Sequence, residues 1–207
     1  MSDQVELTNP VELSVGGMSG QVLRRAIHLG MSFIPLLYFE IGNDVADAIS
    51  LTLEQVVSAV IIFAVFAEAV RLRMGWTIVG QRSYEAKQVS ALAWGALGVG
   101  MVLLLAPDPA YAYPLILSLS LGDPLLGELR RNEVSTNTVI WAGAVGIALI
   151  WASCAYFVDT PWFFVALMGP ICVASEWPRL RYIDDNATML LIPLAVILVC
   201  DPFLGIM

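Results

Sequence analysis

Long segments without charge constrain the fold of this chain more than any other feature of its sequence. Residues 88–106 and 137–157 each contain no Asp, Glu, Lys or Arg, and other apolar segments alternate with short polar connectors. Since a helix needs about 20 mostly apolar residues to cross a bilayer, such segments are typical of membrane spans. Charged residues make up only 14% of the chain, against about a quarter in soluble domains. The sequence therefore predicts an integral membrane protein.

Hydropathy predicts seven spans, with connectors rich in Pro, Asp and Asn between them. Backbone groups in lipid need internal partners, and no strand-like alternation is visible, so we expect every span to be a helix. The expected fold class is all-α: a polytopic transmembrane helix bundle that forms one domain over residues 20–207. Residues 1–19 are expected to be a polar, acidic tail without a signal peptide. The predicted spans are residues 24–42, 52–72, 88–106, 111–129, 137–157, 161–177 and 187–206.

The basic residues predict the orientation of the bundle. With seven spans, all nine Arg residues and the single Lys fall on one face, whereas the opposite loops contain acids but no Lys or Arg. The positive-inside rule then places this face and the N-terminus in the cytoplasm. We expect a multi-pass protein of the plasma membrane, and the excess of Arg over Lys favours a prokaryotic source. The bilayer is an expected partner, and nucleic acid is not.

Ionisable residues gather at the cytoplasmic ends of the predicted spans. Arg24, Arg25 and His28 share one face of the first helix, while Asp123 and Glu176 lie in the fourth and sixth spans. Ionisable groups at membrane depth are costly and tend to face protein or a wet cavity, which makes them functional candidates. Carboxylates that hold Mg²⁺, beside cations that neutralise phosphate, suit phosphoryl transfer. We therefore expect one acidic site with a rim of Arg residues.

Ion pairing offers a structural alternative for two acids. Glu68 with Arg71, and Glu176 with Arg179, have the i,i+3 spacing of pairs on one helix face. Such pairs would close helix ends without any part in binding or catalysis.

Three polar residues, Asp184, Asp185 and Asn186, directly precede the last predicted span. Asp and Asn are good helix caps because their side chains accept hydrogen bonds from free N–H groups, so Asp185 or Asn186 can cap this helix. A single cap does not require two acids and an amide. We therefore expect the acids of this stretch to contribute to the site.

An ordered set of motifs resembles one known family. The motifs are RRAIHLG at 24–30, QRSYEAK at 81–87, LGDPLLG at 121–127, and Glu176 followed by IDDNATMLLIP at 183–193. Together they resemble the membrane-embedded CTP-dependent polyprenol kinases, a family that includes dolichol kinase, phytol kinase and a CTP-dependent diacylglycerol kinase. The resemblance covers most of residues 21–200.

The resemblance implies a lipid kinase with its active site at the cytoplasmic face. Such an enzyme transfers the γ-phosphate of CTP, with ATP not excluded, to an isoprenoid alcohol of the dolichol, phytol or geranylgeraniol type, with Mg²⁺ as cofactor. The residues expected to act in catalysis are His28, Asp123, Asp184 and Asp185. The expected metal ligands are Asp123, Glu176 and Asp185. The residues expected to bind the nucleotide are Arg24, Arg25, Arg82, Lys87, Arg130 and Asn186.

The chain departs from the family pattern after Asp123. Members of the family usually continue to a glycine-rich loop that ends in Lys-Ser, whereas this chain continues as GDPLLGELRR without a Lys. A catalytically inactive relative that binds lipid is therefore one alternative. A small membrane transporter with helices broken at proline is another.

Overall fold

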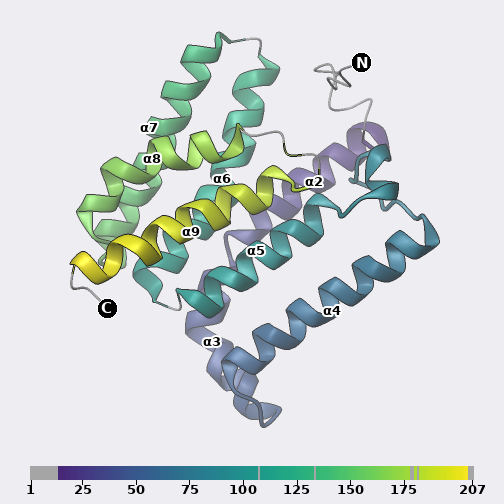
Figure 1. Cartoon of the computed structure of the whole chain (residues 1–207), viewed down its shortest axis with the longest axis horizontal. Coiled ribbons are helices and arrows are strands. Elements are labelled where there is room, and N and C mark those ends of the chain that lie inside the picture. The colour runs from purple at the N-terminus through teal and green to yellow at the C-terminus, as the bar shows by residue number, and fades with distance from the viewer. Residues whose placement is uncertain (1–13, 107, 133, 178–179, 181, 205–207) are drawn as a thin grey trace.

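The computed structural model describes residues 14–106, 108–132, 134–177, 180 and 182–204. These residues are almost entirely helical and form no strand, which confirms the all-α class (Figure 1). The helices are α2 (Gly17–Met31), α3 (Ile34–Ala48), α4 (Leu53–Met74), the 3₁₀ helix η1 (Ser83–Lys87), α5 (Ala91–Leu105), α6 (Pro109–Arg131), α7 (Thr136–Phe157), α8 (Trp162–Glu176) and α9 (Asp185–Leu204). Residues 1–13 of the predicted tail lie outside the described residues. Residues 17–19 of the same predicted tail belong to α2.

Three helices of the described chain are long and apolar enough to cross a membrane: Leu53–Met74, Thr136–Phe157 and Asp185–Phe203. Helices α5 and α8 are apolar but have 15 residues each. At about 1.5 Å per residue, each is shorter than the hydrocarbon core, which is about 30 Å thick. The count of seven spans therefore stays a prediction.

The predicted first span, residues 24–42, is wrong as a single helix. The structure has two helices here, α2 and α3, with a turn at Ser32 and Phe33 between them. Pro35 lies at the start of α3 and has no N–H to donate to the carbonyl of Met31, so a continuous helix would lose a hydrogen bond at this point. The proline therefore divides the segment.

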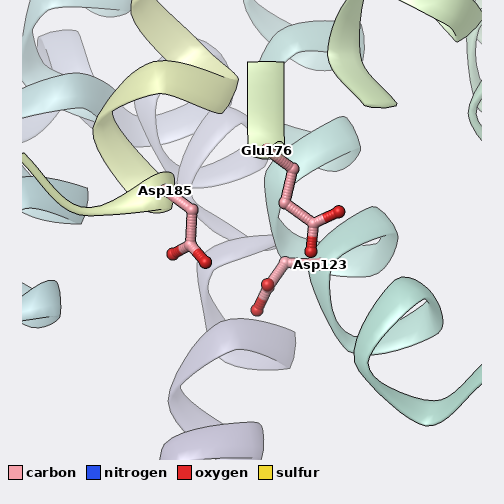
Figure 2. A group of neighbouring side chains, drawn as sticks. All are labelled: Asp123, Glu176 and Asp185. Atoms are coloured by element: carbon pink, nitrogen blue, oxygen red, sulfur yellow. The ribbon is translucent and has the colours of Figure 1, made fainter. Parts of the chain in front are cut away.

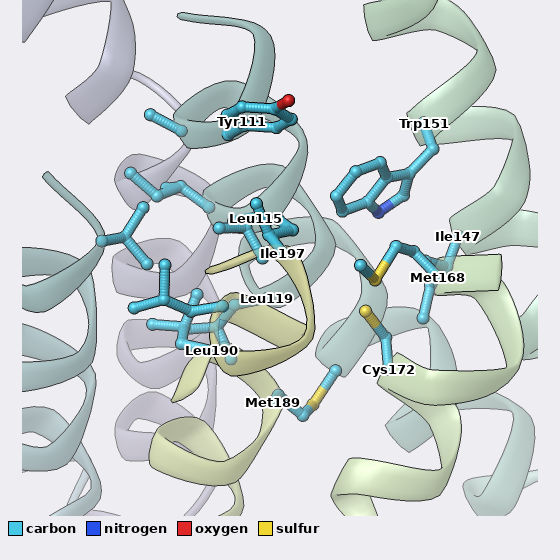
Figure 3. Close-up of a cluster of buried hydrophobic side chains, with 14 of the residues drawn as sticks. Tyr111, Leu115, Leu119, Ile147, Trp151, Met168, Cys172, Met189, Leu190 and Ile197 are labelled. Atoms are coloured by element: carbon cyan, nitrogen blue, oxygen red, sulfur yellow. The ribbon is translucent and has the colours of Figure 1, made fainter. Parts of the chain in front are cut away.

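Helix α6 is the centre of the packing. Helices α4, α5, α9, α8 and α7 pack side by side in this order, and α6 contacts α7, α9, α5, α2 and α3 (Figure 1). The core between α6, α7 and α9 includes Leu115, Leu119, Ile147, Met189 and Leu190, all of which are buried (Figure 3). This packing brings the C-terminal ends of α6 and α8 to the N-terminal end of α9.

Helix α4 lies at the edge of the bundle and packs mainly on α5. Its outer face carries Ile62, Phe63 and Phe66, whose side chains are 69%, 72% and 67% exposed. A contiguous apolar face of this kind indicates contact with another protein or with a membrane. The face is compatible with contact to lipid.

An ion pair on α4 holds the loop that follows it. Arg71 binds Glu68 at 2.8 and 2.7 Å, and also donates to the carbonyl oxygens of Trp76 and Gln88 at 2.6 and 2.8 Å. Glu68 in turn accepts a hydrogen bond from the N–H of Ser90 at 2.6 Å. The predicted i,i+3 ion pair between Glu68 and Arg71 is thus present. The pair fixes both ends of the loop that carries η1.

Candidate functional site

Three carboxylates from three helices meet at one end of the bundle. Asp123 lies in α6, Glu176 is the last residue of α8, and Asp185 is the first residue of α9 (Figure 2). One oxygen of each carboxylate lies within 4.8 Å of the others. The structure therefore brings together the three residues that the sequence analysis assigned as metal ligands. We call these three residues the acidic cluster.

The local sequence around Asp123 allows close packing at this point. A Cβ atom on Gly122 would lie 3.3 Å from Ile147 of α7, so the glycine lets α6 approach α7 closely. Pro124 lies inside α6 and has no N–H, which leaves the carbonyl of Ser120 without its usual helical donor. The Gly-Asp-Pro sequence thus places a carboxylate in a helix that is both closely packed and interrupted in its hydrogen bonding.

Asp184 caps helix α9. Its Oδ1 accepts a hydrogen bond from the N–H of Asn186 at 3.2 Å, and its carbonyl accepts one from Ala187 at 3.1 Å. The expectation that Asp185 or Asn186 is the cap is therefore wrong, because the residue one position earlier performs this role. The carboxylate of Asp185 faces the acidic cluster, where the positive end of the helix dipole favours its negative charge.

Asp184 differs from an ordinary carboxyl group in its affinity for a proton. Burial raises the pKa of Asp184 to about 8, and the negative charge of the adjacent Asp185 acts in the same direction. Asp184 is therefore suited to hold a proton near neutral pH.

Glu176 pairs with Arg130. The guanidinium donates to both carboxylate oxygens, at 2.7 and 2.6 Å, and also lies over the ring of Trp177 at 5.4 Å from its centroid. Bidentate pairs of this kind fix the orientation of both groups. The alternative partner, Arg179, lies outside the described residues. Arg130 was expected to bind nucleotide, and in the structure it positions a member of the acidic cluster.

Of the three residues expected on one face of α2, His28 and Arg24 lie beside the acidic cluster and Arg25 does not. The buried His28 places its Nδ1 3.4 Å from Oδ2 of Asp123. Arg24 lies 3.5 Å from Glu85 of η1. Helix α2 thus supplies an imidazole in contact with the acidic cluster and a cation one turn away from it.

Arg25 faces another part of the molecule. It binds Glu128 of α6 at 2.7 Å, and Arg131 binds the same carboxylate at 2.5 Å. Lys87 is exposed at the end of η1. Among the described residues, it forms no ion pair with the acidic cluster. Of the expected nucleotide ligands, Arg25 and Lys87 are the two that the structure does not bring to the cluster.

Arg82 and Glu85 join η1 to the neighbouring helices. Arg82 donates to the hydroxyl of Tyr84 at 2.5 Å. Burial alone would lower the pKa of Arg82. The contact with Tyr84 and the charges of the two acids at the start of α9 outweigh this effect and raise the pKa, so the guanidinium stays charged near the cluster. Glu85 is buried and accepts hydrogen bonds from the N–H groups of Arg82 and Ala91 at 2.9 and 3.1 Å.

Glu85 was not among the residues predicted for the site. The sequence feature that could have indicated its role is its position three residues after Arg82. A glutamate at the third position of a helix often accepts a hydrogen bond from the N–H of the N-terminal cap. A second buried acid without a predicted role is Asp201, which accepts a hydrogen bond from Tyr111. This pair links the start of α6 to the end of α9, at the opposite ends of these helices from the acidic cluster.

Comparisons of this chain with family models, with curated proteins and with solved structures give no match. The candidate site is therefore defined by its own geometry: three carboxylates, a histidine in contact with one of them, and guanidinium groups on the surrounding helices and loop. Carboxylates of this kind can bind a divalent cation, and guanidinium groups can bind phosphate.

Proposed function

We propose that this chain is a multi-pass membrane lipid kinase. It would transfer the γ-phosphate of CTP, or of ATP, to an isoprenoid alcohol of the dolichol, phytol or geranylgeraniol type. The observation that carries the proposal is the convergence of Asp123, Glu176 and Asp185 from three helices beside His28. Phosphoryl transfer depends on positioning and charge neutralisation by metal ions and cations. The ordered motifs, which resemble those of the polyprenol kinases, are the second support for the proposal.

Mg²⁺ is the cation that we propose for the acidic cluster. It prefers oxygen ligands, and Asp123, Glu176 and Asp185 would each supply one. One oxygen of each of these carboxylates lies within 4.8 Å of the others. When bound, Mg²⁺ would neutralise charge on the nucleotide phosphates. Acids gather on many proteins without a metal, so the identity of the cation rests on the resemblance together with this donor chemistry.

The groups around the acidic cluster would bind and orient the reactants. Arg24 and Arg82 would neutralise phosphate charge, and His28 would orient the acceptor hydroxyl. The hydroxyl oxygen bonds to the γ-phosphorus, the bond from that phosphorus to the bridging oxygen breaks, and the nucleoside diphosphate leaves. The hydroxyl proton passes to a carboxylate, for which Asp184 is our candidate because it directly precedes Asp185 at the start of α9.

The proposed location is the plasma membrane, with the acidic cluster on the cytoplasmic side. Its support is the apolar outer face of α4 and the three helices of spanning length. The bent pair α2 and α3 would act as the first of seven spans. The positive-inside rule supports the orientation.

The deciding experiment uses purified protein in nanodiscs with CTP or ATP labelled at the γ-phosphate. Farnesol, geranylgeraniol, phytol and dolichol serve as acceptors, and labelled lipid phosphate is measured after extraction. We expect a phosphorylated product with at least one alcohol that depends on Mg²⁺. If no acceptor is phosphorylated with either nucleotide, the kinase proposal is wrong.

A lipid-binding relative without catalysis is the second candidate. The observation in its favour is that the cations nearest to Asp123 along α6 are already paired with acids. Arg130 binds Glu176, and Arg131 binds Glu128. Binding of a lipid alcohol without phosphate transfer would favour this candidate.

A further inference from the structure

A cavity of about 110 Å³ lies beside the acidic cluster, between α2, α5 and the loop at residues 78–81. It has two ends of different character. The polar end includes Arg24, His28, Glu85 and Asn186. The apolar wall consists of Leu23, Ile27, Met31, Ile78, Val79 and Leu92.

Asn186 brings an unsatisfied hydrogen-bond acceptor to this cavity. Its Nδ2 donates to the carbonyl of Ala91 at 3.0 Å, while its buried Oδ1 has no hydrogen-bond partner among the described residues. The bond to Ala91 fixes the orientation of the amide, because a flipped side chain would bring two acceptor oxygens together. Asn186 is only 2% exposed, and a buried polar group without a partner is costly. The cavity therefore offers an oxygen that requires a donor.

The polar end of the cavity is continuous with the acidic cluster. His28 lines the cavity and contacts Asp123, and Asn186 directly follows Asp185. A hydroxyl group that donates to the Oδ1 of Asn186 would therefore lie next to the proposed site of phosphate transfer.

The apolar end of the cavity opens onto the outer surface of the bundle. Leu23, Ile27 and Leu92 are 41%, 37% and 47% exposed, and Ile78 and Val79 of the loop are also exposed. An aliphatic chain that leaves the cavity along these side chains stays on an apolar surface.

The size of the cavity selects among lipid alcohols. A cavity of about 150 Å³ holds one benzene molecule, so this smaller cavity accommodates about one isoprenyl unit behind the hydroxyl. A glycerolipid carries two ester groups next to its hydroxyl. A cavity of about 110 Å³ has no room for these two ester groups beside the hydroxyl end of the lipid.

We infer that this cavity binds the hydroxyl end of a single-chain lipid alcohol and excludes glycerolipids with two acyl chains. In the protein without nucleotide, the hydroxyl donates to the Oδ1 of Asn186, the first carbons of the chain contact Ile27 and Leu92, and the tail extends into the bilayer. The assignment of this alcohol as the phosphate acceptor rests on the proposed function. The binding itself does not.

The test is photoaffinity labelling in nanodiscs without nucleotide. The probe is a geranylgeraniol analogue with a diazirine in its first isoprenyl unit, and labelled peptides are identified by mass spectrometry. We expect labels on α2 and α5 that free geranylgeraniol removes by competition. Dioleoylglycerol, and a hydrocarbon of equal length without the hydroxyl, should compete at least about tenfold more weakly, which corresponds to about 1.4 kcal/mol.

A matched pair of glycine variants tests the location. A Cβ atom on Gly95 would lie 3.9 Å from Asn186 and Met31, so the backbone accepts a side chain there while Gly95→Leu fills the cavity. Gly30→Leu on α2 is the control, because nothing lies within 4 Å of its added Cβ. Gly95→Leu should lower labelling at least about tenfold relative to Gly30→Leu. The competition series needs no variant, so the test holds even if Gly95→Leu fails to fold.

Labels on α7 or α8, or equal competition by dioleoylglycerol or the hydrocarbon, would overturn the inference. Labelling of the cavity without any phosphate transfer would support the cavity and reject the kinase. Phosphate transfer with labels elsewhere would do the reverse, so the two proposals fail separately.

Discussion

Arg130 and Glu176 form a bidentate ion pair, with hydrogen bonds of 2.7 and 2.6 Å, that joins the end of α6 to the end of α8. The carboxylate is buried, whereas the guanidinium is partly exposed and stacks on Trp177. Since Glu176 belongs to the acidic cluster, this pair sets the distance between one carboxylate and the other two. Arg130 is therefore a positioning residue in the proposed kinase.

Arg130→Lys tests that role. Lys keeps the charge but cannot donate two parallel hydrogen bonds, so we expect phosphate transfer to fall at least about tenfold. The Mg²⁺ concentration for half-maximal rate should rise in the same variant. Arg131→Lys is the control, because Arg131 binds the more exposed Glu128, and it should retain most activity. Equal activity of both variants would show that only charge matters at Arg130.

Asp185→Asn separates a metal ligand from a helix cap. Because Asp184 caps α9, the variant should keep its melting temperature in detergent. Its phosphate transfer should fall at least about tenfold, with a weaker response to Mg²⁺. Asp184→Asn is the stability control, since Asn and Asp cap about equally well. An Asp185→Asn protein with wild-type rate and Mg²⁺ dependence would remove Asp185 from the metal site.

Arg24 and Arg25 should differ in their contribution to phosphate transfer. Arg24 lines the cavity beside His28, so we expect Arg24→Ala to lower the rate at least about tenfold. Arg25 and Arg131 share Glu128 near the surface, where ion pairs contribute about 0–1 kcal/mol. Arg25→Ala and Arg131→Ala should therefore behave alike and stay within about fivefold of the wild type. A large loss in Arg25→Ala alone would restore its expected contact with phosphate.

Two exposed serines test the orientation in the membrane. Ser50 lies between α3 and α4, and Ser83 lies in η1 at the basic face. With the native cysteines replaced by alanine, Ser50→Cys should react with an impermeant maleimide on intact cells. Ser83→Cys should react only after permeabilisation. Labelling of Ser83→Cys on intact cells would place the basic face outside and contradict a cytoplasmic nucleotide site.

Tyr111→Phe tests the buried hydrogen bond at the far end of the bundle. The variant leaves the carboxyl group of Asp201 without its partner, so the free energy of unfolding should fall by about 1–3 kcal/mol, seen as a lower melting temperature. Phosphate transfer below that temperature should not change, because the pair lies away from the acidic cluster. The double variant Tyr111→Phe, Asp201→Leu should recover part of the loss, since it removes the unpaired group as well.

Much of the fold could be predicted from local features of the sequence. Long apolar segments predicted helices, and residues 53–74, 136–157 and 185–203 are long enough to cross a membrane. The helix ends within residues 24–42 were harder to predict, because the effect of a proline depends on its surroundings. Pro35 begins a new helix, whereas Pro124 and Pro193 lie inside continuous helices. The presence of a proline therefore does not by itself predict where a helix ends.

The acidic cluster was predictable because its residues belong to an ordered set of motifs, but their partners were not. Consecutive residues on a helix differ in direction by about 100°, so Arg24 and Arg25 look equivalent in the sequence yet face Glu85 and Glu128. The pairing of Glu176 with Arg130 likewise depends on how α6 and α8 each pack on α7 and α9. The sequence by itself determined the helices and the acids, whereas the tertiary structure decided which cations meet them. The reason is that these contacts depend on the rotation of each helix against its neighbours.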